Sequence, residues 1–337
     1  MITIDGSEGE GGGQVVRNAC ALSLVTGDPV RITNIRARRS KPGLMRQHVT
    51  AIEAACTVGG GECEGLTVGS SELTFRPGRL MPGEYRFAVG TAGSTGLVLQ
   101  TVLMPLLLAG APSRLVLEGG THNLLAPPFD FIARTFLPIV NRMGPRVEAK
   151  LVRHGFYPRG GGRIEVAIEP APLYPVECLA RGAALGVSAC ALFAGLPFAI
   201  AEREITVIRR DLGWSERESY VRELPGDQGP GNILLLEARF EQVTEIVSGF
   251  GRLGVPAESL AHQASARMRG YLACDAFAGP YLADQLLLPM AVAGGGAFTT
   301  VKPSKHARTA AAVIERFTGR RTSFSQQPGG EHLVTVE

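Results

Sequence analysis

The stretch LSLVTGDPVRITNI, residues 22–35, decides the fold of this chain. It begins as an apolar helix that ends at Gly27, a residue type that commonly terminates helices, and continues as a short strand over residues 30–35. A loop then leads into a second helix, which we predict from Leu44 to about Val58. The stretch therefore predicts the centre of a helix–strand–helix unit.

The same unit occurs twice more along the chain. The two further copies consist of helices that end at Gly110 and Gly294, strands over residues 114–118 and 298–301, and second helices over about 128–143 and 308–317. Alternating stretches between the copies predict additional strands over residues 73–76, 85–89 and 163–168. Three similar units with strands on both sides indicate a repeated α/β module built from mixed sheets with helices on one face.

One region interrupts the repeat and is interpreted as an inserted domain. It follows a proline-punctuated stretch, residues 170–175. Its own predicted elements are strands over residues 184–190 and 233–240 and helices over residues 215–223 and 256–273. The predicted division is therefore a large repeat-built catalytic domain, residues 1–179 and 277–337, and a smaller α/β domain, residues 180–276.

The composition is that of a globular protein with a full hydrophobic core. The chain has 337 residues, of which 45% are hydrophobic. A net charge of +3 is too small to coat the surface with positive charge, so nucleic-acid binding would need local basic patches. Arginine far outnumbers lysine among the cations, which suits bidentate phosphate contacts but fits a GC-rich genome equally well.

Neither the cysteines nor the termini indicate an exported protein. The six cysteines form no C-x-x-C pair and no metal-ligand spacing with histidine, which is typical of reduced core thiols. The N-terminus lacks a basic region followed by an apolar stretch, and polar residues and a proline interrupt the most apolar segment, residues 97–112. We therefore expect a cytoplasmic protein that does not bind membranes.

Two segments near opposite ends of the chain indicate phosphate chemistry. The first is GEGGGQ, residues 9–14, followed by Arg17. Consecutive glycines let backbone N–H groups turn toward an anion, and the start of the following helix adds its positive dipole end. The second is KPSKH, residues 302–306, in which His306 offers a nucleophile. The chain lacks G-x-x-x-x-G-K-[ST], which argues against a P-loop ATPase.

The surroundings of His306 in the sequence favour a neutral ring. A lone histidine at a helix start is often only a cap or a surface residue. His306 follows Lys305, is close to Lys302, and lies just before a helix predicted to begin at about Arg308. Because nearby cations and a helix N-terminus disfavour the imidazolium, we expect a nucleophilic imidazole near pH 7.

Three other segments carry polar groups that have both a functional and a structural interpretation. The run RARRSKPGLMRQH, residues 36–48, puts cations at a helix start, where they either bind an anion or form a solvated basic face. Gln100 lies in an otherwise apolar helix, where glutamine commonly satisfies nearby backbone. Asp284, in the expected first turn of a helix starting near Tyr281, either binds a ligand or compensates the helix dipole, and Tyr281 can stack on a base.

Six segments in one order resemble the RNA 3′-terminal phosphate cyclase family. They are GEGGGQ (residues 9–14), RARRSKPGLMRQH (36–48), HGFYPRGGG (154–162), DQGPGN (227–232), YLADQ (281–285) and the turn that contains His306. The similarity spans nearly the whole chain, and its combination of segments is far more specific than a single motif. It implies an α/β (α+β) fold of tandem βαβαββ-type repeats interrupted by a smaller α/β domain.

The resemblance also implies a three-step reaction. The histidine attacks the α-phosphorus of ATP to give a histidine–AMP phosphoramidate and pyrophosphate. AMP then passes to the 3′-phosphate of an RNA, and the vicinal 2′-OH displaces AMP to close a 2′,3′-cyclic phosphate. Adenylation supplies the leaving group that a phosphate monoester lacks, and the ribose already holds the 2′-OH in place. The implied partner is an RNA with a 3′-phosphate end; DNA ends and an oligomeric state stay open.

Single residues of this chain match the family's functional positions. His306 resembles the adenylated nucleophile, and Glu10 resembles the ligand of Mg²⁺ or Mn²⁺. In the implied ATP site, Tyr281 and Pro127 flank adenine and Asp284 meets the ribose. The full set that resembles the ATP site is Gln100, Pro127, Tyr281, Leu282, Ala283, Asp284 and Gln285. The set that resembles the phosphate and RNA-end site is Arg17, Arg36, Arg39 and Gln47.

The sequence departs from the family pattern at two positions and leaves two rival functions. Ala310 stands where many members have asparagine, and His122 occupies a loop position often held by aspartate, which affects positioning around those loops. One rival is a binding-only, ribosome-assembly homologue, which lacks the nucleophilic histidine; His306 argues against it. The other is an enolpyruvyl transferase on a similarly repeated fold, which the basic run and the YLADQ segment fit poorly.

Overall fold

The computed structural model describes residues 1–337 and contains the predicted repeat three times. Each copy has the element order β-α-β-α-β-β. The first copy comprises β1 (Ile2–Asp5), α1 (Gly13–Thr26), β2 (Val30–Thr33), α2 (Arg46–Gly59), β3 (Glu62–Glu64) and β4 (Leu73–Arg76). Strand β4 has the predicted bounds, and α2 ends within one residue of its predicted end.

The second copy follows directly, and its second helix is divided into three short parts. Its elements are β5 (Glu84–Ala88), α3 (Thr95–Leu107), β6 (Ser113–Gly119), α4 (Phe129–Phe131), the π-helical turn η1 (Ile132–Phe136), α5 (Leu137–Arg142), β7 (Arg146–Arg153) and β8 (Gly162–Glu169). The single helix predicted over residues 128–143 is therefore present as a helix with a wider turn in its middle.

The third copy is split after its first strand by the inserted elements. Its own elements are β9 (Val176–Cys178), α8 (Pro280–Ala293), β14 (Gly296–Thr300), α9 (Lys305–Thr318), β15 (Thr322–Gln326) and β16 (His332–Val336). The inserted elements are β10 (Ala184–Ala194), α6 (Phe198–Leu212), β11 (Ser219–Glu223), the 3₁₀ turn η2 (Gly226–Gln228), β12 (Gly231–Phe240), β13 (Thr244–Phe250) and α7 (Ala257–Leu272).

The three repeats have the same sheet topology. Their strand orders are β1-β2-β4-β3, β5-β6-β8-β7 and β9-β14-β16-β15. In each sheet the first two strands are parallel, as a strand–helix–strand crossover requires, and the last two form an antiparallel pair. The mixed α/β fold expected from the repeated unit is thus confirmed.

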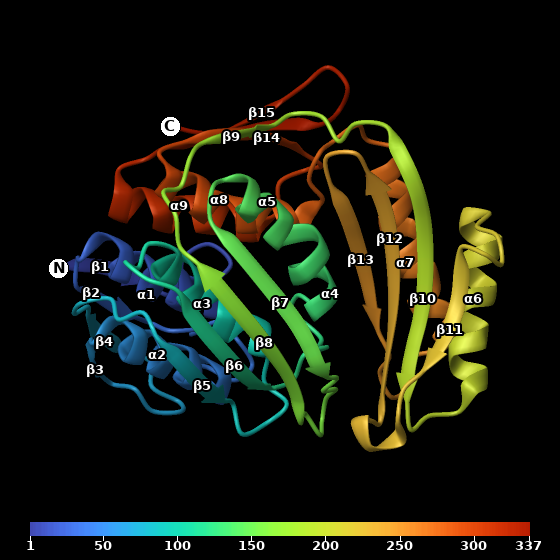
Figure 1. Ribbon diagram of the computed structural model, residues 1–337, viewed down its shortest axis with the longest axis horizontal. Coiled ribbons are helices and arrows are strands. Elements are labelled where there is room, and N and C mark those ends of the chain that lie inside the picture. Colours follow the sequence, from blue (N-terminus) through green and yellow to red (C-terminus); the bar gives the residue numbers. More distant parts are fainter.

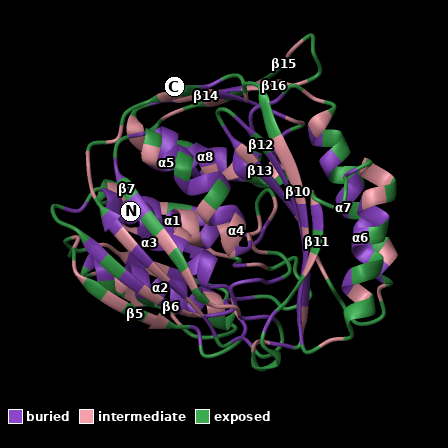
Figure 2. Ribbon diagram, turned by 45° about the vertical axis from the view of Figure 1, so that its right-hand side comes forward, coloured by how far each residue is buried: buried purple, intermediate pink, exposed green.

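Figure 1 shows the three sheets on the outside of the molecule and helices α1, α3, α8 and α9 between them. The strands of these sheets alternate between buried and more accessible residues, as in β6 and β8, so one face of each sheet packs inward (Figure 2). In α3 every residue except Gln100 is buried. Helices of different repeats therefore pack against one another between the sheets, as α1 does against α9 and α3.

The inserted elements form a fourth sheet of their own, with strand order β11-β10-β12-β13. Helices α6 and α7 cover one of its faces, and its other face turns toward α4 and η1 (Figures 1 and 2). An ion pair between Arg134 Nη1 and Glu237 Oε2, 2.5 Å apart, joins η1 to β12. We propose two domains, residues 1–179 with 277–337 and residues 180–276, because the inserted strands form a sheet of their own.

The helix predicted over residues 215–223 is wrong. Residues 219–223 form β11, which pairs in parallel with β10, and the preceding residues form a turn. Both the backbone N–H and the hydroxyl of Ser215 donate to the carboxylate of Glu218, at 2.7 and 2.8 Å, which closes that turn instead of starting a helix.

All six cysteines are free thiols. No helix combines the length and the apolar character needed to cross a bilayer.

Candidate active site

His306 lies in the first turn of α9, with 47% of its side chain exposed. The helix begins at Lys305, three residues before the predicted start, because Ser304 caps it: the Ser304 Oγ accepts from the backbone N–H of Ala307 at 3.0 Å. The sequence argument placed His306 in the turn before the helix, and the structure corrects this. The cap fixes the backbone that carries the imidazole.

The hydrogen bond of His306 determines which ring nitrogen is free. Its Nδ1 is 3.0 Å from Oε1 of Gln14, the second residue of α1. Because an amide oxygen only accepts, Nδ1 carries the proton and Nε2 keeps its lone pair. The carboxylate of Glu10 lies 3.7 Å from the same Nδ1. The imidazole is therefore oriented by two side chains from the glycine-rich segment almost 300 residues away.

The pKa of His306 is lowered from its ordinary value. The largest cause is the loss of hydration on the side that faces the protein, followed by the positive charges of Arg39 and Arg17. The neutral ring predicted from the sequence is thus supported, but the cations responsible are these two arginines and not Lys302 and Lys305. Nucleophilic Nε2 is available at neutral pH.

The glycine-rich segment packs tightly around two functional side chains. Gly9 and Gly11 have φ of +60° and +61°, a region that disfavours other residues. A Cβ on Gly12 would overlap the carboxylate of Glu10, and a Cβ on Gly13 would overlap Nε2 of His48. No side chain caps the N-terminus of α1 at Gly12. Its first backbone N–H groups are therefore free to bind an anion.

Arg17 lies at the electrostatic centre of the site. Burial lowers its pKa to about 10, against the opposing effect of the Asp284 carboxylate. Burial likewise raises the pKa of Asp284 to about 7, and Arg17 opposes that shift. The charge of Arg17 also lowers the pKa of His48 and of His306. Side chains of α1, α2, α8 and α9 thus converge on one guanidinium.

Asp284 has a different place in its helix from the one expected. Helix α8 begins at Pro280, so Asp284 lies in the second turn, and no acidic residue occupies the first. The dipole-compensation alternative from the sequence is therefore wrong, because that effect is confined to the first turn. Instead, the carboxylate faces Arg17 of α1.

The basic loop after β2 turns part of its charge inward. Arg39 forms an ion pair with the Glu10 carboxylate and donates from Nη2 to the Glu10 carbonyl oxygen at 3.2 Å. Arg36, with φ +54°, donates from Nη1 to the carbonyl oxygens of Lys41 and Gly43 at 2.6 and 2.8 Å. Arg36 therefore closes its own loop, which leaves Nη2 and Nε for a phosphate.

Gln47 joins the first two repeats, and His48 beside it lies within the first. The Gln47 Oε1 accepts from the backbone N–H of Ser94, the N-cap of α3, at 3.3 Å. His48 is 3% exposed, and its Nδ1 accepts from the backbone N–H of Met45 at 3.0 Å. Burial and the charges of Arg17 and Arg36 lower the pKa of His48 to about 3, so it stays neutral.

The residues expected in the ATP site come from α8, from the loop before α4 and, for Gln100, from α3. Pro127 lies against Gly96 near the start of α3, and Tyr281 is exposed at the start of α8. Leu282 and Ala283 are buried in the core, so they do not contact a nucleotide directly and instead anchor the helix that carries Tyr281 and Asp284. The buried Oε1 of Gln285 has no hydrogen-bond partner.

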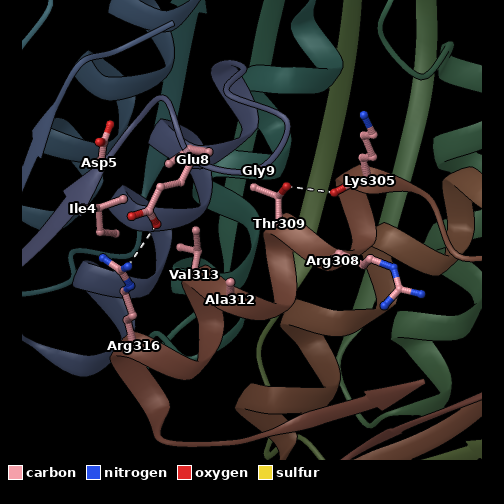
Figure 3. A pocket seen from close by; sticks show the side chains of 11 residues that line it. Ile4, Asp5, Glu8, Gly9, Lys305, Arg308, Thr309, Ala312, Val313 and Arg316 are labelled. Atoms are coloured by element: carbon pink, nitrogen blue, oxygen red, sulfur yellow. Dashed lines mark hydrogen bonds and ion pairs between the residues drawn. The ribbon is translucent and has the colours of Figure 1, made fainter. Parts of the chain in front are cut away.

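A cavity of about 370 Å³ lies beside this site, between the glycine-rich segment and α9 (Figure 3). Thr309, which the sequence analysis did not single out, holds the two walls together: its Oγ1 accepts from the backbone N–H of Glu10 at 2.9 Å and donates to the carbonyl oxygen of Lys305 at 2.8 Å. An ion pair of 3.0 Å between Glu8 and Arg316 spans the same cavity.

Comparison with known proteins decides the family. A profile described as RNA 3′-terminal phosphate cyclase matches residues 8–324. The chain belongs to this family. An RNA 3′-terminal phosphate cyclase of Koribacter versatilis is 51% identical over 94% of this chain and 90% of its own length. Those of Pseudomonas fluorescens and Salmonella enteritidis are 48% and 46% identical over the whole chain, and over 97% and 98% of their own lengths.

Among solved structures, the enolpyruvyl transferase NikO from Streptomyces tendae matches with a TM-score of 0.30 and 18% identity, over 50% of this chain and 33% of that chain. This similarity is too low to bear on function. The family assignment instead removes the enolpyruvyl transferase from the two rival interpretations, since the profile and the relatives named above agree over nearly the whole chain.

The two departures from the cyclase pattern are accommodated in the fold. Ala310 is buried in α9, where it packs in the core. His122 is buried in the loop after β6, where its Nδ1 is 2.8 Å from the Thr121 hydroxyl and its Nε2 is 2.9 Å from Oδ2 of Asp130. Its ring stacks on His154 with centroids 5.0 Å apart. His122 thus fixes the loop that carries Pro127.

Proposed function

We propose that this protein converts an RNA 3′-terminal phosphate into a 2′,3′-cyclic phosphate with ATP, through a covalent bond between His306 and AMP. One observation carries the proposal: the bond from His306 Nδ1 to Gln14 Oε1, 3.0 Å long, leaves Nε2 free beside the N-terminus of α1 and the charge of Arg17. The family name of the relatives supports the same activity.

In the proposed first step, Nε2 of His306 attacks the α-phosphorus of ATP. A P–N bond forms, the P–O bond to the β-phosphate breaks, and pyrophosphate leaves. The ring becomes cationic as Nε2 gives up its lone pair, and the Glu10 carboxylate, 3.7 Å from Nδ1, stabilises that charge. Arg17 and the free N–H groups of α1 face the phosphate oxygens, where charge accumulates.

The second and third steps use the RNA end. An oxygen of the 3′-phosphate attacks the phosphorus of His306–AMP, the P–N bond breaks, and the imidazole is restored. The 2′-OH then attacks the 3′-phosphorus, loses its proton, and AMP leaves. The ribose holds the 2′-OH next to its target, so this step requires little further positioning by the protein. Arg36, Arg39 and Gln47 are the proposed contacts of the RNA end.

The proposed ATP site extends from α8 to α3. Tyr281 and Pro127 flank adenine, and the Asp284 carboxyl meets the ribose hydroxyls. The unpartnered Oε1 of Gln285 supports a polar ligand near this helix, because a buried amide oxygen without a donor costs free energy. Gln100 is the only residue of α3 whose side chain reaches out of the core.

The donor set fits a divalent cation that arrives with ATP. The chain holds no cluster of three metal-ligating residues, so a tightly bound resident ion is not supported. Mg²⁺ commonly takes one or two carboxylates together with substrate phosphates, and Glu10 supplies one. Its Oε1 pairs with Arg39, so Oε2 is the oxygen left for Mg²⁺ or Mn²⁺. When bound, such an ion would neutralise charge on the departing pyrophosphate.

Two matched oligonucleotides test the RNA-end chemistry. An RNA that ends in a 3′-phosphate is expected to be cyclised, whereas the same strand with a 2′-deoxy terminal sugar should stop at the adenylated 3′-end, because it lacks the nucleophile of the last step. Chromatography against a cyclic-phosphate standard separates the products. Conversion of both strands to one product would rule out the cyclase mechanism, and binding of RNA with no turnover would favour the non-catalytic homologue.

A further inference from the structure

Glu245 is a buried carboxyl that the proposed reaction does not use. It lies on β13 of the inserted sheet and is 1% exposed. Its Oε2 accepts from the backbone N–H of Gly279 at 3.1 Å, and its Oε1 has no hydrogen-bond partner. Burying a carboxyl group that accepts only one hydrogen bond costs free energy of folding. The contact between Glu245 and Gly279 therefore indicates a role other than packing.

The partner of Glu245 is the residue from which α8 starts. Gly279 is the N-cap of α8, has no side chain to cap the helix, and precedes Pro280, which has no N–H. A Cβ on Gly279 would overlap Oε1 of Glu245, although its φ of −71° suits any residue. The close approach of the carboxyl therefore explains the glycine.

A second contact from the inserted elements reaches the same helix. Arg267 of α7 donates from Nη2 to the carbonyl oxygen of Ser248 at 2.8 Å, and its Nη1 is 3.5 Å from the hydroxyl of Tyr281. The inserted sheet and α7 thus hold both the backbone at the start of α8 and the aromatic residue on its first turn.

From these contacts we propose that Glu245 is a positioning residue for ATP, which acts through Gly279 to hold the first turns of α8 in place. The inserted elements then contribute to nucleotide affinity without touching the nucleotide. This inference rests on the proposed role of Tyr281 and Asp284 in binding ATP. If Glu245 is removed, α8 samples other positions, and the apparent affinity for ATP falls in proportion to the fraction of molecules that remain binding-competent.

Three variants of the full chain test this role. The equilibrium dissociation constant for ATP and the rate of adenylation at saturating ATP are measured for Glu245→Ala, Glu245→Gln and Glu204→Ala. Glu204 is a matched control, because it is also 1% exposed in the inserted elements but contacts Asn232 of its own sheet and not α8. Glu245→Ala is expected to weaken ATP binding about tenfold. The rate at saturation should change less than threefold, because bound ATP selects the native position of α8.

Glu245→Gln should bind ATP within twofold of the wild type, since its amide oxygen accepts the same bond from Gly279. Glu204→Ala should also stay within twofold. Equal loss of binding in Glu245→Ala and Glu204→Ala would show general destabilisation and overturn the inference. Wild-type affinity in Glu245→Ala would overturn it as well. Absence of ATP binding by the wild type would instead overturn the proposed function itself.

A second variant probes the contact from the other side and remains informative if Glu245→Ala folds poorly. Gly279→Ala brings a Cβ onto the Glu245 carboxyl and is expected to weaken ATP binding about tenfold. In the double variant Gly279→Ala/Glu245→Ala, the carboxyl atoms that the added methyl group would overlap are absent, so its further effect should be less than twofold. Independent, multiplicative effects of the two substitutions would contradict the proposed contact.

Discussion

Four charged or titratable side chains at the centre of the site perturb one another. The positive charge of Arg17 lowers the pKa of His48 and of His306. The carboxylate of Asp284, on α8, opposes the lowering of the pKa of Arg17 itself. A neutral His306 beside two arginines is a nucleophile surrounded by anion-binding groups. That combination suits attack on a phosphate ester, since the two arginines that keep the ring neutral are also the proposed contacts of the phosphate.

The lowered pKa of His306 predicts the pH dependence of adenylation. The neutral ring is the nucleophile, so the rate at saturating ATP should be flat from about pH 6.5 upward and fall only at lower pH, as the ring is protonated. Arg39→Gln lacks one of the two cations that lower the pKa of His306, so the rate of adenylation should begin to fall at a higher pH than in the wild type. Single-turnover rates of adenylation between pH 5 and 8 check this prediction. A wild-type rate that already falls above pH 6.5 as the pH is lowered would contradict it.

Sequence reasoning singled out the proposed site residues but not the side chains that they contact. His306, Glu10, Arg17 and Asp284 all lie in segments that sequence reasoning singled out. It did not predict the bond from His306 to Gln14, because that contact joins residues 292 positions apart and depends on how α1 packs against α9. His48, whose ring packs on the glycine-rich segment, was likewise missed, since its role follows from burial and not from spacing.

The close contact between α1 and α2 makes Gly13 a sensitive position. In Gly13→Ala the new Cβ would overlap Nε2 of His48, so the buried His48 ring must move, which disturbs the neighbouring Gln47 and the start of α3 that it binds. Adenylation should fall at least tenfold, because small displacements of catalytic groups are costly. Gly270→Ala is the control: its Cβ meets nothing within 4 Å in the last turn of α7, and it should leave the rate unchanged while stabilising the helix by at most about 0.5–1 kcal/mol.

Helix α6 contains a buried carboxyl whose titration should be visible in stability. Burial raises the pKa of Glu204 to about 7, against the hydrogen bond from Asn232. Its protonated form therefore contributes stability that is present below about pH 4.5 and is lost as pH rises to about 7. Glu204→Gln should be more stable than the wild type at pH 8, by on the order of 1–3 kcal/mol, with little difference near pH 4.5.

Urea unfolding at both pH values checks this expectation, with the exposed Glu202→Gln on the same helix as control. A constant difference between Glu204→Gln and the wild type across the pH range would show that Glu204 does not titrate as described.

The buried Glu204 also explains why α6 was not predicted from the sequence. Its buried stripe of Ala201, Ile205 and Ile208 includes a carboxylate, which weakens the apolar pattern on which sequence reasoning depends.

Other helices and strands could be predicted from the sequence where a local pattern of apolar residues and glycines defines them. Strand β4 and the ends of α1 and α2 follow from apolar periodicity and terminal glycines. Residues 219–223 were not predictable in the same way, because β11 is a strand only through its parallel pairing with β10. A charged, helix-like composition was overridden by a tertiary contact.

For the whole molecule, the repeats explain why one site is made from both ends of the chain. Three copies of one sheet topology enclose their helices, and this arrangement brings the start of α1 to the start of α9 (Figure 1). The first copy supplies the proposed anion-binding segment, and the third supplies the proposed nucleophile and the helix that carries Asp284. The inserted elements then join the third copy at Gly279, ahead of that helix.

The most direct test of the account is covalent labelling with α-labelled ATP and Mg²⁺. The wild type is expected to keep label through denaturation, as an adduct that is labile to acid and stable to alkali, as a P–N bond requires. His306→Ala should fold and take up no label, since the side chain is half exposed and contributes little packing. His262→Ala, at another exposed histidine, should be labelled as the wild type is. Label on His306→Ala, or none on the wild type, would contradict the account.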